Sequence, residues 1–201
     1  KAAANDESLV EHLISYMLES KQLTEAELRK FKPSICNRLD RNTSGLVVAG
    51  KSLIGLQKMG ELFKDRNLKK YYRCLVAGEV KTKQYIKGYL LKDEATNKVT
   101  ISEKAFGEAL PIETEYEPIW SNGKITLLEV HLITGRTHQI RAHLASCSHP
   151  ILGDYKYGNK KVNDRFKEKY KLGSQLLHAY RLELPVLEEP LQAISEKKFV
   201  A

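Results

Sequence analysis

Residues that could carry out chemistry gather in two polar clusters, and the first spans residues 37–46. Its sequence is Asn-Arg-Leu-Asp-Arg-Asn-Thr-Ser-Gly-Leu, in which Asp40 stands between Arg38 and Arg41. The flanking cations favour the ionised form of the Asp40 carboxyl, which would keep it ready to act as a nucleophile or a base. The alternative is a turn residue whose carboxylate only caps a backbone amide.

The second cluster spans residues 134–143 and follows an apolar, strand-like segment. Gly135 permits a sharp turn, and the helix expected after it would begin with free backbone amides that attract anions. His138 and Arg141 are three residues apart and are expected on one face of that helix. His143 falls among apolar residues on another face, where a hydrogen-bonded structural role is the simpler interpretation.

Several kinds of catalytic site lack their signature in this sequence. His138 and His143 are five residues apart, on different sides of a helix, and no H-x-x-x-H pair occurs, so we expect no metal site. The G-x-S-x-G turn of serine hydrolases is absent. The dinucleotide-binding G-x-G-x-x-G and the phosphate-binding G-x-x-x-x-G-K-[ST] patterns are absent too, which argues against a nucleotide-cofactor enzyme.

The charge of the chain favours a polyanionic partner. Lys and Arg number 33 against 25 Asp and Glu, a formal net charge of +8. The surplus is concentrated in residues 64–73, with five cations against one carboxylate, and in residues 155–171, with seven against two. Nucleic acid is the first partner that this suggests and an acidic membrane the second, whereas two solvated faces are the plain alternative. Binding of RNA by these clusters would weaken steeply with salt.

Two aromatic residues, Tyr71 and Tyr72, follow the first basic run and open a predicted strand. Such rings could stack on bases while the neighbouring cations hold phosphates. Packing within a sheet is the alternative for at least one of them, because adjacent strand residues face opposite sides. We expect one ring to face inward and the other outward.

The elements that must position these residues begin with helices. Apolar residues at three-four spacing predict an amphipathic helix over residues 10–18. Thr24 and Glu27 form the capping box of a second, shorter helix that ends before Pro33. A strand is predicted at Leu46–Ala49, with a helix over residues 53–63 packed behind it.

Short strands dominate the rest of the chain. They are predicted at residues 72–77, 98–102, 112–119, 125–132 and 177–184, with turns at Gly78, Gly107, Asn122-Gly123 and Gly153. One more helix is expected between Gly135 and Cys147. This order of elements predicts an α+β fold with a mixed sheet.

The size and cysteine content limit the setting of the protein. Its 201 residues can form one generous domain or two small ones, and 42% hydrophobic with 29% charged residues is typical of a globular chain. The three cysteines are scattered and form no C-x-x-C pair, which favours a reducing cytoplasm. No apolar stretch is long enough for a membrane helix, and we expect no membrane partner.

Four motifs together resemble the RluA-type pseudouridine synthases. Residues 37–46 resemble the H-R-L-D-R-D-T-S-G-L motif of that family, and the motifs appear in the family's order over roughly residues 35 to 190. The other matches are K-x-Y-x-x-x-V-x-G at Lys70, Tyr72, Val76 and Gly78, the segment Thr134–Arg141 continuing through His149–Asp154 to Tyr157-Gly158, and the closing Leu177-His178-Ala179.

The resemblance implies an isomerase that converts selected uridines of ribosomal or transfer RNA to pseudouridine, without cofactor or metal. It implies the family's catalytic-domain fold, a mixed and largely antiparallel sheet with flanking helices, in a cytoplasmic monomer. Asp40 would be the catalytic carboxylate, Tyr72 would stack on the uracil and could take its C5 proton, and Arg141 would pair with Asp40. Arg38 would take the place of the flipped-out base. The further RNA-binding residues implied are Arg41, Thr43, Gly135, Arg136, Thr137, His138 and Gln139.

The sequence departs from the family pattern at three places. Asn37 replaces the usual His and Asn42 a usual Asp, and the Lys-Pro-x-Gly turn and strand that usually open the catalytic domain are not found. We therefore expect a single catalytic domain over residues 1–201, truncated at its N-terminus, with a helical segment at 1–34 and the motif-bearing core at 35–201. The main alternative is a catalytically inactive RNA-binding protein on the same scaffold. A basic structural or ribosome-associated protein is the third hypothesis.

Overall fold

The computed structural model describes residues 6–201, which divide into two compact units. The helical unit contains the described chain up to Arg38 together with Val47–Leu68 and Leu184–Lys197. The sheet unit contains Leu39–Leu46, Lys69–Glu183 and Lys198–Ala201.

The helical unit contains the helices predicted for the first third of the chain. Its elements are α1 (Leu9–Glu19), α2 (Glu25–Lys30), the two-residue strands β1 (Ser34–Ile35) and β3 (Ala49–Gly50), α3 (Leu53–Lys64) and the 3-10 turn η1 (Gln192–Ile194). The predicted capping box at Thr24 is confirmed, and α1 has a second one at Ser8. Among residues 6–201, no helix has both the length and the apolar content to cross a membrane.

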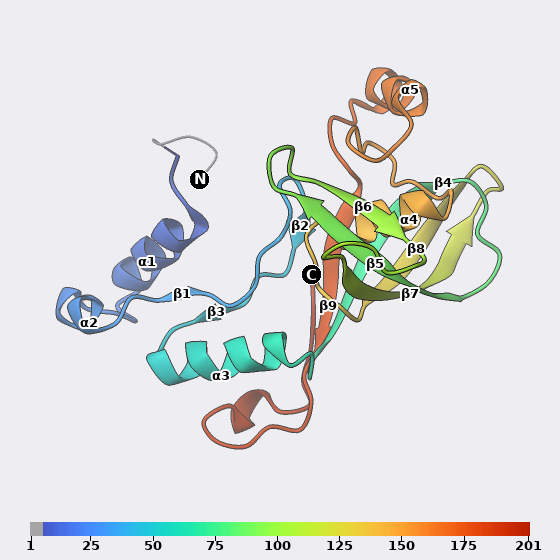
Figure 1. Ribbon diagram of the computed structural model, residues 1–201. Coiled ribbons are helices and arrows are strands. Elements are labelled where there is room, and N and C mark those ends of the chain that lie inside the picture. Colours follow the sequence, from blue (N-terminus) through green and yellow to red (C-terminus); the bar gives the residue numbers. More distant parts are fainter. Residues whose placement is uncertain (1–5) are drawn as a thin grey trace. The chain divides into compact units, whose positions relative to one another are not determined.

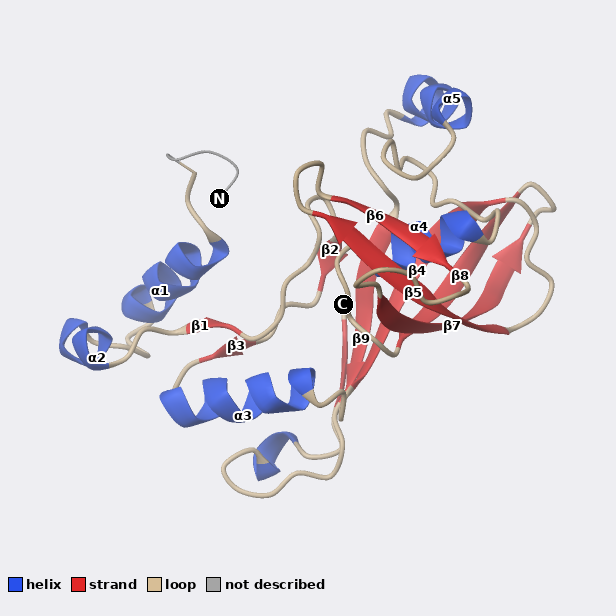
Figure 2. Ribbon diagram, in the orientation of Figure 1, coloured by secondary structure: helices blue, strands red, loops and turns tan. Residues whose placement is uncertain are grey.

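The sheet unit is built on an eight-stranded, mostly antiparallel sheet, which confirms the predicted α+β class (Figures 1 and 2). Seven strands follow one another in the order β10-β9-β4-β8-β7-β5-β6, and β2 pairs with β9 in parallel. The strands are β2 (Ser44–Gly45), β4 (Lys69–Ala77), β5 (Gln84–Asp93), β6 (Lys98–Ser102), β7 (Leu110–Ser121), β8 (Ile125–Leu132), β9 (Leu177–Glu183) and β10 (Lys198–Val200). Its helices are α4 (Gln139–Ser146) and α5 (Lys160–Tyr170).

Helix α4 covers one face of this sheet (Figure 1). Strand β8 alternates buried and half-buried residues along its whole length, the period expected of a strand with one covered face. Ile140 and Leu144 of α4 pack against the buried strand residues Leu128 and Val130 in the main hydrophobic cluster. The apolar side of α4 is therefore fixed on the sheet, and this packing also fixes the position of the polar residues of α4.

The prediction of a strand at Leu46–Ala49 is wrong. The amide of Leu46 donates to the carbonyl of Ala179 on β9, whereas the carbonyl of Val48 accepts from Cys36 next to β1. The chain crosses from the sheet unit to the helical unit within these four residues, so no single strand runs beside them.

Three further differences concern the sheet unit. Strand β5 and helix α5 were not predicted, and the latter occupies the basic run at 155–171. His138 does not share a helix face with Arg141, because it precedes α4 as its N-cap with a φ of 53°. The other predicted strands are confirmed within three residues at each end.

Candidate active site

Asp40 lies on a short loop of the sheet unit that is fastened to β9. The loop ends in β2, where Ser44 pairs with His178 and Gly45 with Ala179. A Cβ atom on Gly45 would lie 2.2 Å from the carbonyl oxygen of Ala179, and its φ is +109°, so only glycine fits this close approach. The motif residues of the loop thus hold the backbone against β9, and the Asp40 side chain keeps a 24% exposed surface.

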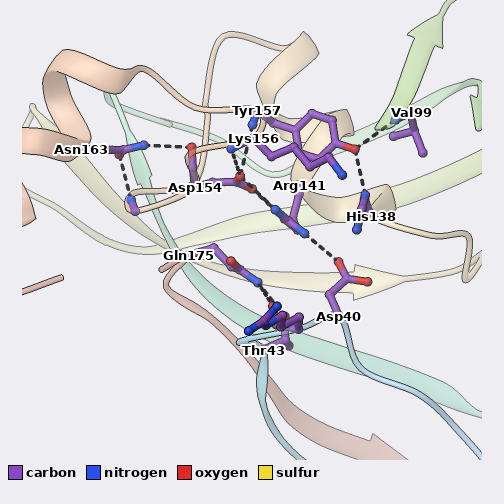
Figure 3. Close-up of polar contacts among 12 residues, drawn as sticks. Asp40, Thr43, Val99, His138, Arg141, Asp154, Lys156, Tyr157, Asn163 and Gln175 are labelled. Atoms are coloured by element: carbon purple, nitrogen blue, oxygen red, sulfur yellow. Dashed lines mark hydrogen bonds and ion pairs between the residues drawn. The ribbon is translucent and has the colours of Figure 1, made fainter. Parts of the chain in front are cut away.

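Gln175 supports the same loop from the segment before β9. Its side-chain amide donates to the carbonyl of Arg41 at 2.7 Å and to the hydroxyl of Thr43 at 3.4 Å (Figure 3). Gln175 itself is buried. The Asp40 loop is therefore held by side-chain contacts as well as by strand pairing.

Arg141 is buried on α4 and reaches Asp40 with one edge of its guanidinium. Its Nη1 lies 3.4 Å from Oδ2 of Asp40, while the other edge of the guanidinium is bound to Asp154, with Nε at 2.7 Å from Oδ2 and Nη2 at 3.0 Å from Oδ1 (Figure 3). The structure thus brings together Asp40 and Arg141, the two residues that the resemblance pairs. It also shows that Asp154, not Asp40, is the main partner of Arg141.

Asp154 is completely buried and has all of its acceptor capacity in use. Besides the two bonds from Arg141, its Oδ1 accepts from the backbone amides of Lys156 and Tyr157 at 2.9 and 3.1 Å. Burial opposes ionisation of the carboxyl, but the hydrogen bonds and charge of Arg141, with the two amides, outweigh it and hold the pKa of Asp154 below its ordinary value. Asp154 is therefore a fixed anion that sets the direction of the arginine fork.

Sequence reasoning did not assign a role to Asp154, although its position carried a signal. It follows the apolar run Ile151-Leu152 and Gly153, all of them buried. Gly153 has a φ of +79° and would place a Cβ 2.1 Å from the carbonyl of Ser174, so the turn that delivers Asp154 requires glycine. An acidic residue directly after such a buried turn must be paired inside the protein.

Tyr157 and His138 close the other side of the arginine. The Tyr157 hydroxyl accepts a hydrogen bond from the amide of Val99 at 3.0 Å and is 2.8 Å from Nδ1 of His138 (Figure 3). Burial lowers the pKa of His138, and Arg141 adds to this effect, against the opposing charge of Asp40. A neutral His138 can accept a hydrogen bond from the Tyr157 hydroxyl at Nδ1, so this ring nitrogen is occupied by a contact within the protein.

The two tyrosines of β4 face opposite sides of the sheet, as expected. Tyr72 packs against the main hydrophobic cluster, and burial together with the charge of Asp40 raises its pKa to about 12. Tyr71 stacks on His131 with ring centroids 4.8 Å apart, and the guanidinium of Arg181 lies 4.0 Å from its centroid. Tyr72 is thus the ring on the side of Asp40.

The remaining predicted site residues differ in how free their side chains are. Gln139 is buried: its Oε1 accepts from Thr134 and the Arg136 amide, and its Nε2 donates to Thr114 and the carbonyl of Glu113. Gln139 is therefore saturated by contacts within the fold. Arg41 and Gly135 are exposed, Thr137 is half-buried, and the Nε of Arg136 is buried without a partner in the described part of the chain.

Two residues of the first motif belong to the helical unit. Arg38 is exposed, and Asn37 accepts a hydrogen bond from the amide of Val48 at 2.7 Å. The asparagine that stands in place of the usual histidine therefore holds the backbone between residues 37 and 48.

His143 has the structural role expected of it. It is buried on α4 with its Nδ1 3.0 Å from the hydroxyl of Thr114. Within residues 6–201, no group of three His, Cys, Asp or Glu side chains is arranged to hold a metal ion.

Comparison with known proteins gives the class to which this fold and site belong. The model of the RNA pseudouridylate synthase family matches residues 10–146. An uncharacterized RNA pseudouridine synthase of Mycoplasma genitalium is 39% identical over 160 residues, covering 79% of this chain and 49% of that protein. The chain therefore belongs to the RNA pseudouridylate synthase family, whose members are RNA-modifying isomerases of the RluA type.

Two further relatives are named for the large ribosomal subunit. Ribosomal large subunit pseudouridine synthase D of Borreliella burgdorferi is 32% identical over 198 residues, covering 98% of this chain and 56% of that protein. Synthase C of Vibrio vulnificus is 32% identical, covering 82% of this chain and 53% of that protein. The chain thus spans about half the length of the curated relatives it matches.

A solved structure supports the fold. The human RNA pseudouridylate synthase domain containing 4 superposes with a TM-score of 0.68 at 24% identity, covering 86% of this chain and 72% of that one.

Proposed function

We propose that this protein converts specific uridines of ribosomal or transfer RNA to pseudouridine, with Asp40 as the catalytic carboxylate. The observation that carries the proposal is the chain of contacts from buried Asp154 through Arg141 to half-exposed Asp40. It presents one carboxylate to solvent in a fixed direction, which is what attack on a ribose or assistance to glycosidic cleavage needs. The names of the synthase C and D relatives favour ribosomal RNA.

The reaction breaks the bond between ribose C1′ and uracil N1 and forms a bond from C1′ to C5 of the rotated ring. The proton leaves C5 and N1 gains one, so the product is an isomer and no redox partner is needed. Tyr72 stacks on the uracil in this proposal. Because its pKa is about 12, its phenol stays protonated at neutral pH, which favours stacking over removal of the C5 proton.

RNA contacts are assigned to two segments. Arg38 fills the space of the flipped-out base, and Arg41 and Thr43 hold the nearby backbone. In the second segment, Gly135, Arg136 and Thr137 contact phosphate or ribose, and the unpartnered Nε of Arg136 supports this assignment. His138 and Gln139 act by holding the turn, since their side-chain hydrogen bonds lie within the fold.

The test is tritium release from RNA labelled at uracil C5, on unmodified ribosomal and transfer RNA separately, with Asp40→Asn as the control. We expect release from one pool that disappears in the variant. Arg141→Ala is expected to lose most turnover while it still binds RNA. RNA binding that is indifferent to Asp40→Asn, with no release from either pool, would instead establish the inactive RNA-binding protein.

A further inference from the structure

Helix α5 touches the rest of the sheet unit with only one narrow side. Val162, Asn163 and Phe166 are covered, whereas the other residues of the helix are exposed. Figure 1 shows α5 projecting away from the sheet, joined to it by loops at both of its ends. Most of its surface is therefore available to another molecule.

The cations on the exposed surface of α5 form two stripes, and the carboxylate of Glu168 lies between them. On one stripe Lys160 pairs with Asp164 at 2.7 Å, and Lys160 with Lys167 helps to lower the pKa of Asp164. The second stripe, which we call the cationic stripe, consists of Lys161, Arg165 and Lys169, spaced at i, i+4 and i+8. None of its three members forms an ion pair within the described residues.

Such a stripe destabilises its own helix, since like charges at i, i+4 repel one another. The neighbouring stripe relieves the same problem with the Lys160–Asp164 ion pair, whereas Glu168, which lies beside the cationic stripe, forms no ion pair with its members among the described residues. Its members follow one another about 6 Å apart along the helix axis. A row of cations at regular spacing is complementary to a polyanion with repeated charges.

Helix α5 is also fastened to the candidate active site. Buried Asn163 accepts a hydrogen bond from the amide of Gly153 at 2.8 Å and donates to the carbonyl of Asp154 at 2.9 Å (Figure 3). Asp154 in turn holds Arg141, which contacts Asp40. The cationic stripe therefore has a defined place relative to the carboxylate at which the uridine is to react.

Positive charge continues between α5 and the site. Lys156 lies two residues after Asp154, and its ammonium donates to the carbonyl of Asn97. Partial burial lowers the pKa of Lys156, as do the charges of Arg141 and Lys98. Cations are thus crowded on the path from α5 to Arg141.

We propose that Lys161, Arg165 and Lys169 bind backbone phosphates of the RNA whose target uridine enters the Asp40 site. This inference rests on the proposed function for the identity of the RNA. Binding at the stripe supplies affinity without reading bases, because phosphate contacts carry no sequence information.

The experiment compares two triple variants of the 201-residue chain. One replaces the cationic stripe by Lys161→Gln, Arg165→Gln and Lys169→Gln, and the matched control carries Lys160→Gln, Lys167→Gln and Lys171→Gln. Both lose three positive charges from the same helix region. The dissociation constant for unmodified large-subunit ribosomal RNA is measured over a series of salt concentrations, and thermal unfolding followed by circular dichroism checks that both variants fold.

We expect the stripe variant to bind more weakly and to lower the slope of log K against log salt by about 2, from three phosphates at about 0.7 each on single-stranded RNA. The control is expected to keep the parent slope. Equal changes in the two variants would show that net charge alone matters and would overturn the proposal. An unchanged slope in the stripe variant would also overturn it. In a parallel assay with phosphatidylglycerol vesicles, a stripe variant that keeps its RNA affinity and loses only vesicle binding would overturn it as well.

These outcomes are independent of turnover. Because only binding is measured, a parent chain that releases no tritium would overturn the proposed function while the slopes still decide the role of the stripe.

Discussion

Two loops of the sheet unit offer a carboxylate to the same arginine, and they do so in opposite ways. Asp154 has no exposed side-chain surface and accepts two bonds from Arg141 at 2.7 and 3.0 Å. Asp40 is 24% exposed and meets Arg141 through one contact of 3.4 Å. The strong Arg141–Asp154 pair thus stabilises the structure, whereas the weak Arg141–Asp40 pair leaves the Asp40 carboxylate available to a substrate.

The contrast explains why an arginine stands at this position. Its planar fork can bind one carboxylate with the Nε edge and still present Nη1 to another, which a lysine ammonium cannot do in a fixed direction. Burial of the Arg141–Asp154 pair costs desolvation energy that good geometry must offset. The two amides that also bind Asp154 provide that geometry.

The same substitution at each carboxylate should give opposite results, and the largest effect concerns Asp40. Asp40→Asn is expected to lower turnover by about 10³-fold or more, the scale of losing a nucleophile or base. Its unfolding free energy should stay within about 0.5 kcal/mol of the parent, because the contact to Arg141 is long and the Asp40 side chain is partly exposed. Tritium release and urea unfolding measure the two quantities. Turnover within tenfold of the parent would remove Asp40 from the chemistry.

Asp154→Asn should reverse this profile. It leaves the Arg141 cation buried without its main partner, and we expect a loss of about 3 kcal/mol in the free energy of unfolding. Turnover should fall about 10²-fold through misplacement of Arg141, with RNA affinity kept. The matched control is Asp164→Asn, which removes the surface ion pair with Lys160 and should leave stability and turnover near the parent. Parent-like stability in Asp154→Asn would show that the buried pair does not support the fold.

Acid titration separates Asp154 from His143, a buried histidine whose pKa burial lowers to about 4. The unfolded histidine binds its proton near pH 6.5, so the stability it contributes is present above pH 6.5 and is lost as pH falls toward about 4, by about 2 kcal/mol. The folded pKa of Asp154 is also depressed, so its contribution is present above about pH 3.9 and is lost only below that.

Urea unfolding from about pH 7.5 to about pH 3 should therefore show two successive losses of stability. We expect His143→Gln to diminish the upper one, to which His131 and His138 also contribute because burial lowers their pKa values, and Asp154→Asn to remove the lower one. A pH profile of Asp154→Asn that parallels the parent through the lower range would contradict the assignment.

The same pair shows what sequence could and could not predict. Asp40 stands out because it lies between two cations in a motif, and the family resemblance implied its contact with Arg141. The dominance of Asp154 over Asp40 was not, because the strength of a pair depends on burial and on which edge of the guanidinium faces which carboxylate. Neither quantity is written in residue spacing.

The elements missed by sequence reasoning have physical causes of their own. In β5, Gly88 and the lysines at 87 and 92 interrupt the alternation that marks a strand, although its partners β6 and β7 on both sides hold it in the sheet. In α5 only Val162 and Phe166 supply apolar contacts, and the third inward residue is the polar Asn163. Because hydrogen bonds of Asn163 replace part of the apolar contact, α5 lacks the apolar periodicity by which a helix is recognised in a sequence.

The smallest expected effect tests how the Asp40 loop is held compared with the Asp154 loop. Gln175→Ala removes the donor to the carbonyl of Arg41, and we expect a loss of about 1 kcal/mol in the free energy of unfolding. Because β2 still fastens the loop to β9, turnover should fall by less than about 10-fold, in kcat and not in KM. The control is Gln84→Ala, since the exposed side chain of Gln84 donates to the nearby hydroxyl of Thr82. An unchanged kcat in Gln175→Ala would mean that strand pairing alone positions Asp40, whereas a loss as large as that of Asp154→Asn would show that the exposed carboxylate depends on its supports as strongly as the buried one.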